Sequence, residues 1–148
     1  MRRFMLVATM SAVMTLPAWG QEAPAFARSS SPFQDEYELT LGRPVQVRVD
    51  IVGVRVDTLT VTPAAEVEAG KEVRTEFALS GDNSASDRAT VTAVLLLEDA
   101  DGHGLERVTL DSFRVRGERS FDERQTLRVP GEALAGAAKI YVLLEVEF

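Results

Sequence analysis

The residues best suited to chemistry in this chain lie in one acidic stretch, LEDADGHGLE, at positions 97 to 106. Glu98, Asp99 and Asp101 gather carboxylate oxygens, the ligands that Ca²⁺ prefers, and we take Asp99 and Asp101 as a candidate calcium site. The spacing does not fit a helix-loop-helix calcium loop, because aligning Gly102 with its glycine leaves apolar residues at both end positions. The alternative is a hairpin turn on Asp101 and Gly102, which tolerate the positive dihedrals that such turns need.

His103 is the only histidine of the chain and lies in the same stretch. A Ser-His-acid triad needs a positioned serine, whereas the serines gather in segments that we expect to be irregular, such as 29–31 and 84–86. A single histidine without cysteine cannot supply the nitrogen and sulfur ligands of a zinc site. We therefore interpret His103 as a solvated turn residue.

Neighbouring carboxylates, such as Asp35 with Glu36 and Asp122 with Glu123, keep a carboxylate-based hydrolase open as an alternative. A carbohydrate-processing cleft usually adds aromatic platforms, and the only tryptophan, Trp19, lies near the amino terminus. The charged residues are explained more simply as the solvated faces of strands. We expect no catalytic residues, no cofactor and no enzymatic activity.

The first residues predict a secretory signal peptide over positions 1–20. A short positive start is followed by an uncharged apolar run, 4–16, that is shorter than the roughly 20 residues a membrane-spanning helix needs. Small residues then precede Gln21. Cleavage near Gly20 removes two arginines and no acid, so the formal charge of −7 for the whole chain becomes −7 − 2 = −9. We expect a periplasmic or extracellular protein, and the absence of cysteine means that its fold rests on its core alone.

Residues 21–35 contain two prolines and three consecutive serines, a composition that predicts a flexible leader before a single domain at 36–148. The acidic balance argues against nucleic acid as a partner, since phosphate recognition requires a basic face. We also expect no membrane insertion of the mature chain.

From Glu36 onward, apolar residues alternate with charged ones at the period of a β-strand, and turn residues separate the alternating segments. Seven or eight strands at this spacing predict an all-β fold, an immunoglobulin-like sandwich of mostly antiparallel strands. Residues 131–138 predict one helical turn. The expected strands are 36–41, 44–52, 54–62, 72–80, 88–98, 105–115, 120–129 and 139–148.

One internal repeat constrains the first strands: VRVDIVG at 47–53 is followed directly by VRVDTLT at 54–60. Because seven is odd, a strand running straight through would place the two sets of valines on opposite faces. The chain must therefore kink and cross between sheets near Gly53, or form two strands joined by a tight turn at Val52 and Gly53.

The stretch LTVTPAAEVEAGKEVRTEFALSG at 59–81, with the DADG turn and the closing VPGEALAGAAKIYVLLEVEF, resembles the bacterial immunoglobulin-like and fibronectin-type-III-like modules of exported proteins. Turn placement carries the resemblance, and the cysteine pair and core tryptophan of antibody domains are absent. The resemblance implies a binding, spacer or assembly role and assigns no residue to it.

The ending YVLLEVEF, at 141–148, fits either the last strand of a sandwich or that of a small outer-membrane β-barrel. A barrel needs aromatic girdles, and after position 20 the chain has eight aromatic residues, two of them in the predicted leader. Residues 122–126 are also polar on both faces. The sandwich is therefore favoured, with an inward face formed by Val142, Leu144, Val146 and Phe148.

These observations favour an exported, non-catalytic binding or assembly accessory protein. A structural subunit of an envelope or surface assembly is the main alternative. Because an open sandwich leaves unpaired strand edges, we expect a protein partner to bind through a strand edge or through the N-terminal leader. The final strand and the strand that follows the leader are the candidate edges.

Overall fold

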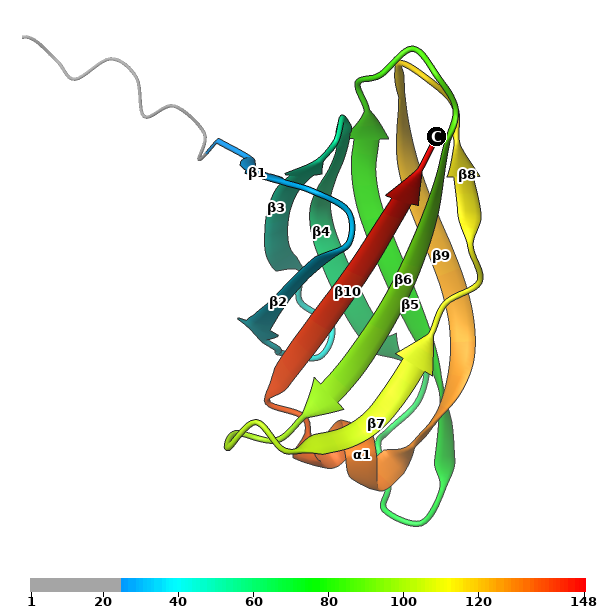
Figure 1. The fold of residues 1–148 in the computed structure, drawn as a ribbon. Coiled ribbons are helices and arrows are strands. Elements are labelled where there is room, and N and C mark those ends of the chain that lie inside the picture. Colours follow the sequence, from blue (N-terminus) through cyan, green and yellow to red (C-terminus); the bar gives the residue numbers. More distant parts are fainter. Residues whose placement is uncertain (1–24) are drawn as a thin grey trace, which may run out of the picture.

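The computed structural model describes residues 25–148, which form two β-sheets packed face to face (Figure 1). The predicted signal peptide, 1–20, and the first part of the predicted leader, 21–24, lie outside the described residues. Among the described residues, no helix is long and apolar enough to cross a membrane. The elements are β1 (Ala27–Ser29), β2 (Phe33–Glu38), β3 (Val45–Ile51), β4 (Val54–Pro63), β5 (Glu72–Asn83), β6 (Ala89–Glu98), β7 (Gly104–Thr109), β8 (Phe113–Val115), β9 (Arg119–Pro130), α1 (Gly131–Gly136) and β10 (Lys139–Glu147).

Sheet A has the strand order β1-β3-β4-β5-β9, and sheet B has the order β2-β10-β6-β7, with β8 also paired to β6. The β1–β3 pair is parallel, whereas the other pairs are antiparallel. The predicted all-β sandwich is confirmed. Residues 25–148 contain ten strands, because β1 precedes the first predicted strand and the segment 105–115 divides into β7 and β8.

The core lies between the sheets and is filled by the alternate residues that the period-two pattern predicts to face inward. Burying each such side chain stabilises the fold by about 1.5–3 kcal/mol. Ala133 and Leu134 of the short helix α1 are also buried, which confirms the predicted helical turn. The largest fully buried side chains include Phe77, Ile51, Leu59, Leu79, Leu95, Leu97, Leu134, Ile140 and Leu144.

The two copies of the valine repeat, 47–53 and 54–60, form a tight hairpin of β3 and β4. Ile51 pairs with Val54, so Val52 and Gly53 alone form the turn, with φ of 46° and 105°. The two-residue turn reverses the chain within sheet A and returns both sets of valines to the core. Crossing between sheets at Gly53 is therefore wrong, and the tight-turn alternative is confirmed.

Two parts of the described leader, residues 27–29 and 33–35, lie in strands that the sequence did not predict, and the flexibility of the leader stays a prediction. Ala27–Ser29 pairs with Val49–Ile51, and Phe33–Glu38 pairs with β10. The Ser31 hydroxyl oxygen accepts a hydrogen bond from the Val146 amide at 2.9 Å. Backbone pairing to existing strands and the partial burial of Phe33 and Tyr37 place this largely polar segment, which has too few apolar residues to give a strand signal.

The prediction that the final strand lies at a sheet edge is wrong. β10 lies inside sheet B, between β2 and β6, and is therefore not an edge (Figure 1). Val142, Leu144 and Val146 face the core as predicted, whereas Phe148 is 58% exposed. Pairing with β6 ends at Glu147, so the last residue extends past the sheet and has no opposite strand to pack against.

Candidate functional site

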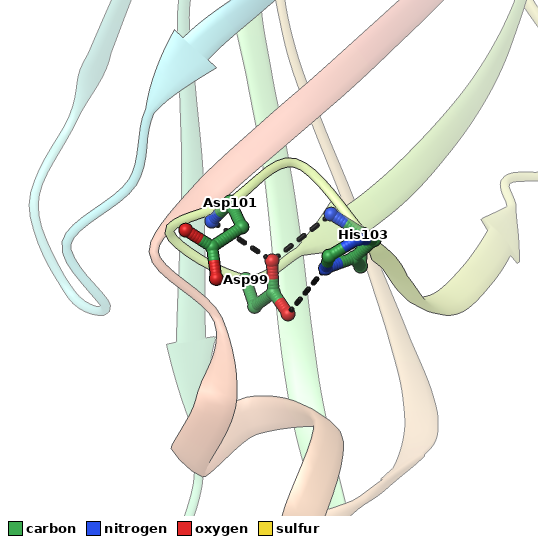
Figure 2. A group of neighbouring side chains, drawn as sticks. All are labelled: Asp99, Asp101 and His103. Atoms are coloured by element: carbon green, nitrogen blue, oxygen red, sulfur yellow. Dashed lines mark hydrogen bonds and ion pairs between the residues drawn. The ribbon is translucent and has the colours of Figure 1, made fainter.

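The predicted acidic turn connects β6 to β7, and the Asp99 carboxylate is at its centre (Figure 2). Asp99 Oδ1 accepts hydrogen bonds from the backbone N–H groups of Asp101 and His103, both at 2.9 Å. Asp99 Oδ2 lies 3.3 Å from Nδ1 of His103. The Gly102 amide donates to the Asp99 carbonyl oxygen at 3.1 Å, and φ of Gly102 is 83°. Gly102 takes the positive dihedral expected of this turn, whereas Asp101 does not.

The same hydrogen bonds lower the pKa of the Asp99 carboxyl from its ordinary value. The His103 backbone N–H contributes most, burial opposes it, and the Asp101 backbone N–H adds a further lowering. Donors aimed at a carboxylate favour its charged form. Asp99 is therefore an ionised residue whose oxygens anchor the loop backbone.

Asp99, Asp101 and His103 each place one possible ligand atom within 4.8 Å of the others. Ca²⁺ takes about six to eight oxygen ligands, whereas this group offers two carboxylates and one ring nitrogen. Asp99 Oδ1 already accepts two backbone hydrogen bonds, which compete with coordination. Calcium binding by Asp99 and Asp101 stays a prediction, and these side chains supply only part of a coordination shell.

The His103 side chain is exposed, and over residues 25–148 its hydrogen bonding is limited to Asp99. A triad would need a serine hydroxyl within hydrogen-bond reach of the second ring nitrogen. The described residues place no serine there. The arrangement is that of a loop histidine paired with its anchoring carboxylate.

The adjacent carboxylates singled out in the sequence do not face each other. Asp122 and Glu123 are consecutive in β9, and Asp35 and Glu36 are consecutive in β2. Consecutive side chains of a strand point to opposite faces of its sheet. Neither pair can therefore act on one substrate atom from the two sides that glycoside hydrolysis requires.

Sheet B instead brings together a carboxyl pair that the sequence did not predict. Lys139 of β10 pairs with Glu98 of β6, and its Nζ lies 3.2 Å from Oε1 of Glu36 in β2. The Glu36 and Glu98 carboxyl groups are near enough to interact by hydrogen bonding, with opposite effects on their pKa values. Glu98 is only 6% exposed, and its Oε2 has no further partner among the residues of the structure. No local motif signals this cluster, because three distant segments contribute to it.

Burial and the neighbouring Glu36 raise the pKa of Glu98, whereas the hydrogen bond with Glu98 and the Lys139 ammonium lower the pKa of Glu36. Glu98 is thus the member that keeps its proton to higher pH, and Lys139 offsets the charge of Glu36. Carboxyl groups of glycosidases stand at least about 5 Å apart to admit substrate, so a pair within hydrogen-bonding reach leaves no such space. The cluster is arranged to link three strands.

Three of the four sheet edges carry charges that oppose the addition of another strand. β9 presents a long outer edge with Glu123 on its inward face, and Gln125 uses its side-chain amide to exchange two hydrogen bonds with the Asp111 backbone, at 2.7 and 2.8 Å. β2 and β7 are short. The charged residues along these three edges are Asp35, Glu36, Glu38, Glu106, Arg107, Arg119, Asp122, Glu123, Arg124 and Arg128.

The fourth edge, along β3 in sheet A, is covered by another strand. β3 alternates valine and isoleucine with polar residues, and its outer side is covered by the three residues of β1, pairing with Val49–Ile51. The side chains of Ala27 and Arg28 are exposed and Ser29 is half-buried. Farther along, the Tyr37 hydroxyl donates to the Val47 carbonyl oxygen at 3.3 Å. β3 itself carries Arg48 and Asp50, and the short segment β1 covers part of this edge.

Comparison with known proteins gives no family for the chain. No family model matches it, and no curated protein matches it. Among solved structures, it is similar to the enzymatically active domain of tailspike protein 4 of bacteriophage CBA120, at 13% identity and a TM-score of 0.23. The match covers 78% of this chain and spans 17% of the tailspike chain. A likeness at this level indicates neither a shared family nor a shared function.

Proposed function

We propose that this chain is an exported, non-catalytic binding or assembly protein with an immunoglobulin-like sandwich, which engages a protein partner at the β3 edge. The observation that supports the proposal is the three-residue strand β1, which covers this edge by parallel pairing. An edge that is covered only by a short strand can accept a longer strand in its place. The charged edges at β2, β7 and β9 are unsuited to that role.

Few contacts hold β1 against β3. The Phe26 ring, one residue before β1, lies between two guanidinium groups, with Arg48 Cζ at 5.9 Å and Arg55 Cζ at 5.5 Å from its centroid. Exposed contacts of this kind contribute about 0.5–1 kcal/mol each. The last hydrogen bond of the pairing, from the Val52 amide to the Ser29 carbonyl oxygen, is long at 3.4 Å. A competing strand therefore has few contacts to replace.

The same contacts describe the partner. It presents an extended segment of more than three residues, which makes a longer ladder with β3 than β1 does. An aromatic side chain at the position of Phe26 would occupy the space between Arg48 and Arg55. The partner is another protein, or the amino-terminal segment of a neighbouring subunit in an envelope assembly.

The test is site-specific photo-cross-linking in periplasmic extract of the source bacterium. A photoreactive amino acid replaces Asp50, which faces away from the core on β3, in the mature chain and in a chain lacking residues 21–29. We expect a discrete cross-linked protein whose yield rises when β1 is deleted. Phe26→Ala should raise the yield in the same direction, because it weakens the docking of β1.

Two matched controls give the result its meaning. The same photoreactive residue at Arg124, on the charged β9 edge, should give no such product. Phe148→Ala removes an aromatic residue that is more exposed than Phe26 and lies outside sheet A, and it should leave the yield at Asp50 unchanged. Equal products from Asp50 and Arg124, or none from Asp50 after deletion of β1, would contradict the proposal.

A further inference from the structure

The outer face of sheet B carries an apolar cluster in a position that faces water in a single sandwich. It consists of Tyr141 and Leu143 of β10 and their direct partners Leu96 and Val94 of β6, all partly exposed. With Arg107 of β7, these side chains line a shallow hollow of about 240 Å³. Contiguous exposed apolar groups rimmed by polar residues are typical of binding surfaces.

The charges around this cluster have a definite order. The ladder register places Glu36, Tyr141, Leu96 and Arg107 in one row across β2, β10, β6 and β7. The row therefore has a carboxylate at one end, which Lys139 also contacts, apolar side chains in the middle and a guanidinium at the other end. Arg107 is exposed and takes part in no ion pair over residues 25–148.

We propose that this face binds the same face of a second copy of the chain. A two-fold axis that runs parallel to the strands, between β10 and β6, exchanges the two ends of every row (Figure 1). Glu36 then lies opposite Arg107 of the second copy, and Tyr141 lies opposite its Leu96. This self-complementary arrangement is what a two-fold symmetric interface requires.

The next row gives the same result. Gln34, Leu143, Val94 and Thr109 follow one another across the same strands, so the axis sets Leu143 against Val94 and Gln34 against Thr109 of the second copy. An axis perpendicular to the strands would place β7 against β7 and would separate Arg107 from any carboxylate of the other copy's β2. The order of charges thus selects one packing of the two sheets.

The interface is small. Four strands about 4.8 Å apart and a few rows of side chains give a face roughly 20 Å on a side. This falls below the roughly 800 Å² per partner of a stable interface, so we expect a weak, reversible dimer. The surface is separate from the β3 edge, and the inference does not depend on the proposed function.

The experiment uses charge reversal in the mature chain, with association followed by sedimentation equilibrium and concentration-dependent NMR shifts. Arg107→Glu sets Glu36 against a glutamate and Glu36→Arg sets Arg107 against an arginine, so each variant alone should dissociate at least tenfold more readily than the wild type. An equimolar mixture of the two variants restores an opposite-charge pair at both ends and should associate again. Arg128→Glu makes the same charge change on sheet A and should associate like the wild type.

Circular dichroism establishes that each variant is folded, and a labelling experiment keeps the test independent of Glu36, which also contacts Lys139. The chain contains no cysteine, so Thr109→Cys provides a single spin-label site. The label should broaden the Gln34 amide of an isotope-labelled second copy and leave Arg124 unaffected.

Two outcomes would overturn the inference. One is a wild-type chain that stays monomeric up to about 1 mM, the weak end of specific association. The other is association that survives Arg107→Glu but disappears on deletion of residues 21–29, which would assign it to exchange of β1 instead. The second result would favour the β3 edge, so the failure of this inference is distinguishable from that of the proposed function.

Discussion

Asn83 offers the sharpest test of how the two sheets are joined. It ends β5 in sheet A, just before residues 84–88 carry the chain to β6 in sheet B, and it is 1% exposed. Its Nδ2 donates to the carbonyl oxygens of Asp87 at 2.8 Å and Val115 at 3.4 Å, and its Oδ1 accepts from the Ala85 amide at 3.0 Å. Asn83→Ala removes all three bonds and leaves the backbone groups without partners.

The expected cost follows from these bonds. Two are short and one is long, each contributes about 0.5–1.5 kcal/mol, and unsatisfied buried groups add to the loss. We expect the free energy of unfolding to fall by about 2–4 kcal/mol, which lowers the melting temperature by about 8–15 °C in a domain of this size. Urea unfolding followed by far-ultraviolet circular dichroism measures it, since the predicted mature chain has no tryptophan.

Two further variants make the result interpretable. Thr126→Ala changes an exposed β9 residue and should alter stability by less than about 0.5 kcal/mol. Asn83→Asp keeps the acceptor but points a carboxylate at two carbonyl oxygens, so its cost should exceed that of alanine at neutral pH. An Asn83→Ala variant as stable as Thr126→Ala would refute the reasoning.

Three other expectations follow from the structure. The pKa of Glu98 is raised in the folded state, so its protonated form stabilises the fold fully below pH 4.5, its unfolded value, and this stabilisation is lost as pH rises through the folded pKa. Glu98→Gln should therefore reduce the fall in the free energy of unfolding between pH 4.5 and neutrality. An unchanged pH profile of stability would contradict this expectation. Gln125→Ala should cost about 1–2 kcal/mol in urea unfolding through its two bonds to Asp111, whereas an equal loss with Thr126→Ala would remove the assignment. Gly81→Ala should lower the free energy of unfolding by about 1–3 kcal/mol, because a Cβ there would meet the Arg55 carbonyl oxygen and the Phe121 ring. A melting temperature equal to that of the wild type would contradict this, because it would mean that β4 and β5 move apart without cost.

The strands that the sequence predicted well are those whose inward residues are apolar. In Ala89–Glu98 and Lys139–Glu147, alternation alone gives both the element and its buried face. The turn at Gly53 was left open between two structures, because local dihedral preferences permit both and only pairing of β3 with β4 decides. The period-two signal thus determines faces more firmly than connections.

The features that the sequence did not predict depend on the order of strands in the sheets, which no local pattern contains. β1 and β2 are largely polar segments that backbone pairing holds, with Phe33 and Tyr37 of β2 packed on the core, and β10 is internal only because β2 pairs with its free side. For the same reason the cluster of Glu36, Glu98 and Lys139 joins three segments that share no motif. The Asp99 loop was predictable, since its anchoring contacts span only a few residues.

The central claim is that β1 is a readily displaced cover on the β3 edge, and hydrogen exchange of the Val52 amide tests it most directly. This amide donates to the Ser29 carbonyl oxygen, so it reports separation of β1 from sheet A. Phe77 of β5, flanked by β4 and β9, serves as the reference for global unfolding. We predict that Val52 exchanges through a local opening with a free energy several kcal/mol below that of Phe77. Equal opening free energies at the two amides would contradict the claim.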